Sequence, residues 1–297
     1  MLILFILIAI GFFAGKIRIF TQEGIKCIND LMLFIVSPCV IINAFQRPFD
    51  YELLKGLGIS MAASLFFHLM CIGLSYLFIR NKDEHRRKIL RFGVIFSNCG
   101  FMGLPLLDAL LGSEGVFYGA GYLAVFNTLV WSYGQYIMAK GADGFEVKKA
   151  FLNPGTISVL VGLGLFFGSV QFPPVILSPI AFLSGLNTPV PMLIIGYTMS
   201  KMDLKSVFMI REAFMTIALR LVVAPLILLA ILYGVGIRGT LLVATMVSSC
   251  APVAAISTMF SIRYKLDEGL ASKVVAASTL LSIISMTLIV GFARYIA

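Results

Sequence analysis

The sequence contains few charged residues. Of its 297 residues, 12% are Asp, Glu, Lys or Arg, whereas 60% are hydrophobic and the mean hydropathy is +1.00. A water-soluble domain with an ordinary polar surface could not sustain this balance. The composition therefore predicts a polytopic membrane protein.

Sequence motifs of several enzyme classes are absent. No GxxxxGKS or GxxxxGKT phosphate loop occurs, and no connection is long enough for an ATPase domain, which argues against an ATP-driven pump. The chain has no GxSxG elbow and no HExxH helix, so an intramembrane hydrolase that pairs His68 with a serine is a distant alternative. The five cysteines lie in or beside apolar stretches, and carboxylates are sparse. We therefore expect no disulfide framework, no metal site and no cofactor.

Ten apolar runs are present, judged against the roughly 20 residues that a spanning helix needs. They lie near residues 1–16, 24–46, 53–79, 88–111, 115–139, 153–170, 174–200, 207–234, 239–260 and 268–296. The first is short for a bilayer. A polar connection, residues 140–149, separates five runs from the other five. We expect an all-α membrane protein with ten transmembrane helices, divided into residues 1–145 and residues 146–297.

Basic residues are distributed unevenly among the connections. Of the 23 Lys and Arg residues, only Arg47, Lys55, Arg238 and Arg294 fall in one set of alternate connections or at the C-terminus, and Arg220 lies within a span. The positive-inside rule places the other, basic set in the cytoplasm and both termini outside. The net charge of +9 therefore reports orientation in the plasma membrane and does not indicate a nucleic-acid partner.

The two halves share weak similarities in the same order. The pattern of Ser37–Ile42 recurs as Val190–Ile195, and Asn98-Cys99 recurs as Ser249-Cys250 at nearly the same offset. Because each half has an odd number of spans, the second half enters the membrane from the opposite side. These observations predict an inverted-topology repeat.

The fourth and ninth runs are each interrupted by polar residues. Ser97-Asn98-Cys99-Gly100 precedes Pro105 in one run, and Ser248-Ser249-Cys250-Ala251-Pro252 interrupts the other. Hydrocarbon does not tolerate the backbone groups that such breaks leave unpaired, unless they face protein or a wet cavity. In an inverted repeat the breaks approach each other near the midplane, where free N–H groups favour an anion. The alternative is a kinked helix whose Ser and Asn side chains only repair lost backbone bonds. The candidate substrate-binding residues are Ser97, Asn98, Cys99, Gly100, Ser249, Cys250 and Pro252, together with Asn43 in the second span.

Four charged or titratable residues lie within or beside the spans. Arg220, halfway through the eighth span, is expected to face the bundle interior. It could neutralise an anionic substrate, but we favour a structural brace for carbonyls that Pro225 would free. His68 could relay protons or be a neutral imidazole bonded to a carbonyl. Asp30 and Asp108 are candidates for ion or proton handling, although Asp108 fits a solvated carboxylate and Asp30 could lie beside Lys26.

Prolines mark further interruptions. Pro38 and Pro191 are expected to bend the second span of each half, where kink geometry alone explains them as well as a role in the substrate wall. Pro105 and Pro252 accompany the breaks of the fourth and ninth runs.

Several segments, taken in order, resemble the auxin efflux carrier family, which groups bacterial organic-acid permeases with the plant PIN-FORMED carriers. The resemblance covers nearly the full length. It is carried by Phe96–Leu106, by Asn153-Pro154, by Ile28-Asn29 followed by Pro38, by Arg220 with Pro225, by Arg238–Leu242, and by Ala251-Pro252 running to Tyr264.

The resemblance implies a ten-helix inverted-repeat fold similar to the bile-acid symporters. Spans 1, 2, 6 and 7 would form a scaffold, and spans 3–5 and 8–10 a transport domain. Asn98 matches the crossover asparagine that contacts substrate carboxylate in the plant carriers, and Pro252 matches the crossover proline. Ser97 departs from the proline of plant members, and their long cytoplasmic loop is missing, which favours a bacterial permease. The plant relatives also imply a homodimer.

The sequence thus predicts a secondary-active transporter of small organic anions that works by an elevator-like movement of a transport domain. The substrate could be a mono- or dicarboxylate or an auxin-like aromatic acid, and coupling stays open among proton symport, exchange and uniport. The expected partners are the anion and membrane lipids. A channel that uses the same breaks as a pore is the first alternative, and a non-transporting sensor or scaffold is another.

Overall fold

The computed structural model describes residues 2–139, 154–201 and 211–297. Within these ranges the regular elements are helices, and the only strand-like feature is an isolated bridge between Ser97 and Val253. The polar connection at residues 140–149, the predicted boundary at residues 145–146, Asn153 and the start of the eighth run lie outside the described residues.

Six helical stretches in the described chain are long and apolar enough to cross a membrane. They are Gln22–Ala44, Tyr51–Phe78, Cys99–Met138, Pro174–Ser200, Ala213–Gly234 and Glu268–Ile296. Three shorter apolar helices are Ile6–Lys16, Pro154–Phe167 and Gly239–Cys250. The chain is therefore an all-helical, multi-pass membrane protein.

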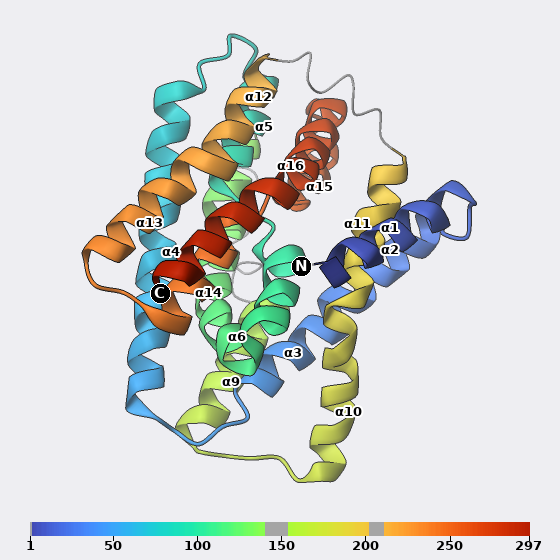
Figure 1. The fold of residues 1–297 in the computed structure, drawn as a ribbon. Coiled ribbons are helices and arrows are strands. Elements are labelled where there is room, and N and C mark those ends of the chain that lie inside the picture. Colours follow the sequence, from blue (N-terminus) through green and yellow to red (C-terminus); the bar gives the residue numbers. More distant parts are fainter. Residues whose placement is uncertain (1, 140–153, 202–210) are drawn as a thin grey trace.

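One group of helices, apart from α9, lies together on one side of the molecule (Figure 1). In this group α1 packs against α11, and α3 packs against α9 and α10. Its elements are α1 (Leu2–Lys16), α2 (Gln22–Leu31), η1 (Met32–Val36), α3 (Ser37–Ala44), α9 (Pro154–Phe167), α10 (Pro174–Ser184), η5 (Gly185–Asn187) and α11 (Pro189–Ser200).

The remaining elements form a second group. Within it α6 packs against α4 and α14, and α14 also packs against α16. Its elements are α4 (Tyr51–Phe78), α5 (Glu84–Ile95), η2 (Cys99–Gly103), α6 (Leu104–Leu129), η3 (Val130–Gly134), α7 (Gln135–Met138), α12 (Arg211–Ala218), η7 (Leu219–Val223), α13 (Ala224–Gly234), α14 (Gly239–Cys250), α15 (Ile256–Arg263) and α16 (Glu268–Ile296). Contacts of α3 and α9 with α6, and of α11 with η2 and α16, join the two groups.

Polar side chains set the starts of four helices. Thr21 accepts a hydrogen bond from the Gly24 N–H at the start of α2, and Asp50 accepts one from Leu53 at the start of α4. Asp83 and Asp267 cap α5 and α16 in the same way. Such caps satisfy N–H groups that have no partner within the helix. They fix where the chain leaves each connection.

Three π-helical turns each precede a proline by two residues. The turns η1, η2 and η7 are followed by Pro38, Pro105 and Pro225. A proline donates no hydrogen bond to the carbonyl four residues earlier, and its ring crowds that carbonyl. In each case this carbonyl lies at the centre of the π turn, so the helix widens there instead of breaking. The expected bend at Pro38 thus takes the form of a π turn.

The second span of the other half is interrupted differently. Here the 3₁₀ turn Gly185–Asn187 and Thr188 separate α10 from α11, and Pro191 lies in the first turn of α11. The interruption therefore lies before Pro191. The fourth and fifth predicted runs meet at Gly112, whose φ of 61° and ψ of −154° are not helical. A positive φ suits glycine, which has no Cβ to clash.

Candidate functional site

The candidate site lies where two helices are interrupted. Helix α5 ends at Ile95, and the chain is extended at Phe96 before η2 begins at Cys99. Helix α14 ends at Cys250, and residues 251–255 connect it to α15. The sequence predicts interruptions at these places.

The two breaks pair with each other. Asn98 N–H donates to the Pro252 carbonyl at 2.7 Å, and Ala254 N–H donates to the Phe96 carbonyl at 3.0 Å. These bonds flank the antiparallel bridge between Ser97 and Val253. The breaks thereby satisfy part of each other's exposed backbone, as a dry environment requires. We call the segments 96–103 and 248–256 the crossover.

Side chains complete the pairing. Ser97 Oγ donates to the Ser248 carbonyl at 3.2 Å, and Val253 N–H donates to Ser278 Oγ at 3.1 Å. Ser97, Ser249, Cys250 and Pro252 are buried. Ser249 Oγ donates to the Met246 carbonyl of its own helix. Ser97 and Ser249 therefore repair local backbone, as the alternative interpretation of the breaks anticipates.

Arg220 lies at the carbonyl ends of both broken helices. Its guanidinium is fully buried and donates to the carbonyls of Val94 and Ile95, each at 3.3 Å. It also donates to the carbonyls of Ser249 at 2.6 Å and Ala251 at 3.2 Å. The last carbonyls of a helix are unpaired and carry partial negative charge, so a cation is stabilised there.

Arg220 therefore acts as a structural brace, but the carbonyls that it binds are not the ones expected from the sequence. The carbonyls come from α5 and α14 and not from the turn before Pro225. The guanidinium also lies 5.0 Å from the ring centroid of Phe67 in α4. Sequence spacing could not reveal this arrangement because the accepting helices are distant in the chain.

The amide ends of the crossover are less satisfied. The Asn98 carbonyl accepts from Met102 N–H and Gly103 N–H. Among the described residues, no carbonyl accepts from the N–H groups of Cys99, Gly100 and Phe101, and no hydrogen bond is found for the Asn98 side chain. The N–H groups of Cys99 and Gly100 contact the Cys99 sulfur, which is a weak acceptor. Asn98 is 9% exposed. The start of η2 therefore offers N–H donors with no carbonyl acceptor beside a nearly buried amide, which suits a carboxylate.

Small residues keep the crossover narrow. A Cβ on Gly103 would lie 3.7 Å from Ser248 Cα, and one on Gly100 would lie 3.8 Å from Leu123 Cδ1. Cys99 is buried, and Gly100 is half-buried. Alanine fits at either glycine, whereas a longer side chain at Gly100 would occupy the space beside Asn98.

His68 lies next to this core. It is fully buried, and its Nδ1 lies 2.7 Å from the Ser64 carbonyl. A carbonyl only accepts, so Nδ1 carries the proton and Nε2 of a neutral ring is left as an acceptor. Nε2 has no partner in the described part of the chain. The contact matches the imidazole bonded to a carbonyl, one of the two roles considered for His68.

The other candidates lie away from these contacts. Asp30 and Asp108 are exposed, and Asp30 forms no salt bridge with Lys26 within the described ranges. Lys26 and Asp30 are four residues apart in α2, so they lie on the same face of this helix without forming a salt bridge. Asn43 is half-buried, and its side chain has no hydrogen bond to the crossover among the residues described. No group of three or more His, Cys, Asp or Glu residues that could hold a metal is present in the described chain.

Several residues near the crossover were not anticipated. Thr188 Oγ1 donates to the Pro105 carbonyl at 3.5 Å, and the neighbouring Asn187 is 1% exposed with an unpartnered Nδ2. Tyr122 is fully buried, and its hydroxyl has no partner among the described residues. Ser278 supports the backbone of Val253. The Gly185-Leu186-Asn187-Thr188-Pro189 run could have indicated a further polar break, whereas Tyr122 and Ser278 carry no such signal.

These features define a multi-pass helical membrane protein with a site at interrupted helices. The family model described as "Membrane transport protein" matches residues 1–290. The chain belongs to this family, which is the auxin efflux carrier family that residues such as Phe96–Leu106 resemble. It is accordingly a membrane transporter and not an enzyme.

Two archaeal relatives are similar over almost their full length. An "Uncharacterized transporter" of Methanothermobacter thermautotrophicus is 25% identical over 291 residues, covering 95% of this chain and 94% of the relative. The "Uncharacterized transporter MJ1031" of Methanocaldococcus jannaschii is 24% identical over 301 residues, covering 97% and 96%.

Proposed function

We propose that the protein is a secondary-active transporter of small organic anions that binds the substrate carboxylate at the crossover. The observation that carries this proposal lies at the start of η2, where backbone N–H groups donate to no carbonyl and the Asn98 side chain has no hydrogen bond among the described residues. A carboxylate accepts several such bonds, and the positive end of a helix favours its charge. Mono- and dicarboxylates and auxin-like aromatic acids are the substrate classes.

The arrangement proposed around this site is a pair of inverted repeats, residues 1–145 and 146–297, with ten spans in total. Spans 1, 2, 6 and 7 form the scaffold, and spans 3–5 and 8–10 form the transport domain. The packing of α1 on α11 and of α3 on α9 and α10 supports a separate scaffold. Thr188 of the scaffold reaches Pro105 of the transport domain, so the crossover lies beside the surface along which the two would slide or rock.

Arg220 acts in this proposal on the crossover itself rather than on the substrate. It joins the ends of α5 and α14, so both breaks would move together with the transport domain. Its positive charge near the site would also lower the electrostatic cost of a buried anion. His68 and Tyr122, with their free polar atoms close by, are the candidates for proton coupling.

We place the protein in the plasma membrane with both termini outside and propose a homodimer. The sidedness is supported by the scarcity of Lys and Arg in one set of connections. A channel would use the same breaks as a continuous pore. Carrier and channel differ in counterflow, because only a carrier exchanges labelled for unlabelled substrate faster than it equilibrates alone.

The experiment that tests the proposal begins with a thermal-shift screen of organic acids at two pH values. A ligand that binds the folded state raises its melting temperature. We expect a carboxylate to stabilise the purified protein and then to show saturable uptake and counterflow in proteoliposomes. Uptake without counterflow would favour the channel, and no uptake of any stabilising acid would contradict the proposal.

A further inference from the structure

Two adjoining cavities lie at the basic end of α4 and α5, and one of them extends along α5 to Ile95, next to the crossover. One has a volume of about 480 Å³ and the other about 450 Å³, and they share Tyr76, Arg87 and Arg91. We call them together the basic pocket. Its walls come from the end of α4, the connection that follows, α5, η3 and α7.

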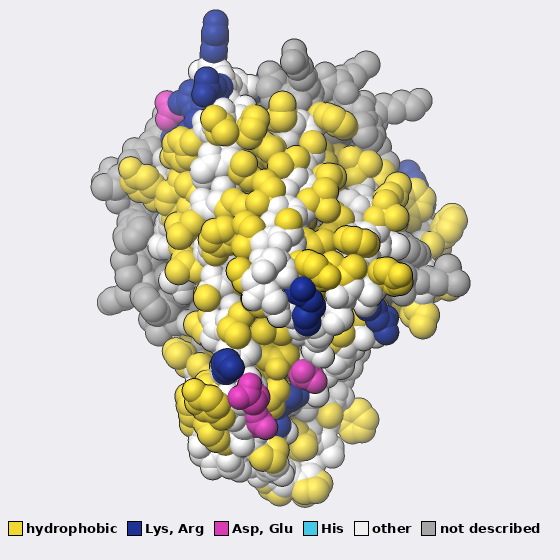
Figure 2. All heavy atoms as spheres, turned by 60° about the vertical axis from the view of Figure 1, so that its left-hand side comes forward, with side chains coloured by type: hydrophobic (Ala, Val, Ile, Leu, Met, Phe, Trp, Pro, Cys, Tyr) yellow, Lys and Arg dark blue, Asp and Glu magenta, His cyan; other side chains and the backbone are white. Residues whose placement is uncertain are grey.

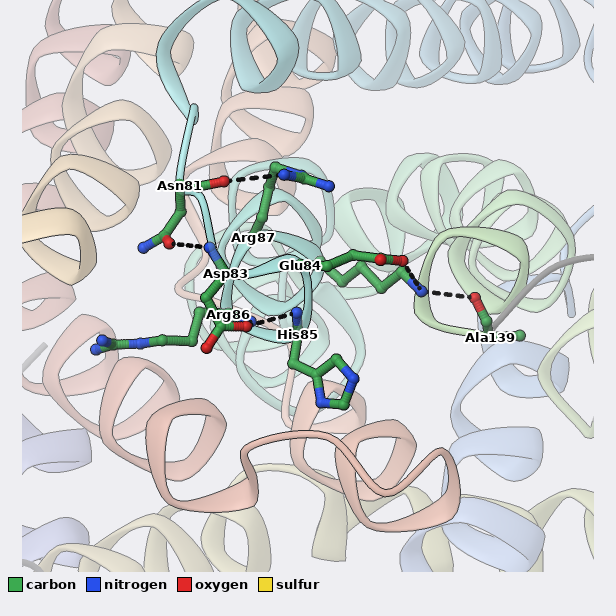
Figure 3. Close-up of polar contacts among 8 residues, drawn as sticks. Asn81, Asp83, Glu84, His85, Arg86, Arg87 and Ala139 are labelled. Carbon is green, nitrogen blue, oxygen red and sulfur yellow. Dashed lines mark hydrogen bonds and ion pairs between the residues drawn. The ribbon is translucent and has the colours of Figure 1, made fainter.

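Positive charge dominates the basic pocket. Its basic lining residues are Arg80, Lys82, Arg87, Lys88 and Arg91. The carboxylate that lines it, Glu84, lies 2.8 Å from Lys88 Nζ. Glu84 is paired with Lys88, and this pairing lowers the pKa of Glu84. Among the described residues, no carboxylate is paired with the arginines of the pocket. Asp83 is turned to the backbone of α5, where it accepts from His85 N–H and Arg86 N–H (Figure 3).

Backbone carbonyls hold these arginines in place. Arg91 donates from Nε and Nη2 to the Ile79 carbonyl at 3.2 and 3.1 Å and lies 4.0 Å from the Tyr76 ring centroid. Arg87 Nη1 donates to the Asn81 carbonyl at 2.9 Å (Figure 3). Arg80 Nε donates to the Leu77 carbonyl at 3.0 Å. A guanidinium has five N–H donors, so each arginine retains donors for a ligand.

A lipid-facing surface adjoins the basic pocket. Tyr76, Leu77 and Phe78 at the end of α4 are 48%, 55% and 46% exposed, and Tyr136 of α7 is 54% exposed. The apolar span Tyr51–Phe78 ends at this point. Figure 2 shows a broad hydrophobic face with Lys and Arg side chains at its upper end and again in its lower part. Aromatic residues beside the end of a span are typical of headgroup depth in a bilayer.

We propose that the basic pocket binds the phosphate headgroup of an anionic phospholipid, with the acyl chains lying along Leu77 and Phe78. Arginines held in fixed positions suit phosphate, which accepts paired N–H bonds. Basic cavities between spanning helices bind acidic headgroups on the side of the membrane where anionic lipids gather. A free phosphate shares the headgroup chemistry, but it would leave the neighbouring apolar surface unused.

The test compares lipids on the purified full-length protein. Native mass spectrometry and thermal shift are measured with phosphatidylglycerol, with phosphatidylcholine and with inorganic phosphate. We expect retained phosphatidylglycerol and a higher melting temperature with that lipid alone. Equal effects of phosphatidylcholine, or full stabilisation by inorganic phosphate, would overturn the proposal.

Variants locate the binding. The double variant Arg80→Gln/Arg87→Gln is expected to weaken phosphatidylglycerol binding about 30-fold. Each basic residue near a headgroup strengthens binding by a similar factor, and this variant removes two of them. Arg238→Gln is the matched control, because Arg238, like Arg80 and Arg87, donates to backbone carbonyls but lies at another site. Unchanged binding by the double variant would refute the assignment.

A second variant covers the case in which the double variant does not fold. Arg80→Gln alone alters an exposed residue at the rim of the basic pocket. We expect it to fold with the wild-type melting temperature in lipid-free detergent and to bind phosphatidylglycerol several-fold more weakly. Wild-type affinity in this folded variant would refute the assignment as well.

Discussion

At the scale of single residues, the crossover separates two electrostatic tasks. Arg220 donates hydrogen bonds to the carbonyls at the ends of α5 and α14. Asn98 lies at the start of η2, next to backbone N–H groups that donate to no carbonyl. The cation therefore stabilises the break permanently, whereas the amide end stays available for an anion. This division follows from the opposite polarity of the two ends of a helix.

Replacing Arg220 tests the brace. Arg220→Met leaves the carbonyls of Val94, Ile95, Ser249 and Ala251 without their donor in a buried position. We expect a loss of about 3–5 kcal/mol in the free energy of unfolding, because breaking a buried charged contact has a cost of this size. Equilibrium unfolding in detergent measures it.

The control is Arg238→Gln, which alters an exposed arginine. This change should lie within about 1 kcal/mol of the wild type. An Arg220→Met protein as stable as the wild type would show that the guanidinium does not support the breaks.

The sequence predicted which residues have a structural role better than it predicted which residues they contact. A charged side chain inside an apolar run must have polar contacts, so the brace at Arg220 follows from the sequence. Its partners Val94 and Ile95 lie more than a hundred residues earlier, where no local pattern connects them.

At the scale of helices, α1 and α11 approach through small residues. Gly11 and Gly15 in α1 face Gly196 and Ser200 in α11. A Cβ on Gly196 would lie 2.6 Å from the Phe12 backbone nitrogen, and one on Gly11 would lie 2.7 Å from Leu193 Cα. Without a hydrophobic driving force between helices in lipid, such close backbone packing is what holds them together.

Gly196→Ala tests this contact. The added methyl group must push the two backbones apart, so we expect a loss of about 1–3 kcal/mol in stability despite the better helix propensity of alanine. Thermal unfolding of the purified protein measures the change. The matched control is Gly73→Ala in α4, where a Cβ meets nothing within 4 Å.

Gly73→Ala should be neutral or stabilise the protein by up to about 1 kcal/mol. Equal behaviour of the two variants would mean that α1 and α11 are not in close contact.

The kinds of interruption were less predictable than their positions. The prolines at 38, 105 and 225 indicate disturbed helices, but whether a helix widens, bends or breaks depends on what satisfies its carbonyls. At Phe96–Asn98, ahead of the π turn before Pro105, and at Pro252, the opposite break and Arg220 satisfy the backbone, so the chain leaves the helical conformation. At Pro38 and Pro225 the helix only widens into a π turn.

At the scale of the whole molecule, the distribution of Lys and Arg predicts the orientation of the protein in the membrane, and this prediction can be tested. Lys82 lies in a basic connection, and Arg238 lies in a connection poor in charge. In a Cys27→Ser background, which removes an exposed thiol, Arg238→Cys should react with an impermeant maleimide on intact cells. Lys82→Cys should react only after permeabilisation, and the reverse pattern would contradict both termini lying outside.

The apolar runs and their interruptions could be predicted because lipid imposes a strong local constraint on sequence. The close packing of α1 on α11 and the hydrogen bond of Thr188 to Pro105 could not, because both depend on contacts between distant segments.

The most direct test of the account is transport by Asn98→Ala in proteoliposomes, once the screen has supplied a carboxylate substrate. Loss of hydrogen bonds to a charged ligand should weaken substrate binding roughly 10- to 100-fold, with uptake falling accordingly and the melting temperature without ligand unchanged. Gly164→Ala, where a Cβ meets nothing within 4 Å, should transport like the wild type. Wild-type uptake and affinity in a folded Asn98→Ala protein would contradict substrate binding at the crossover.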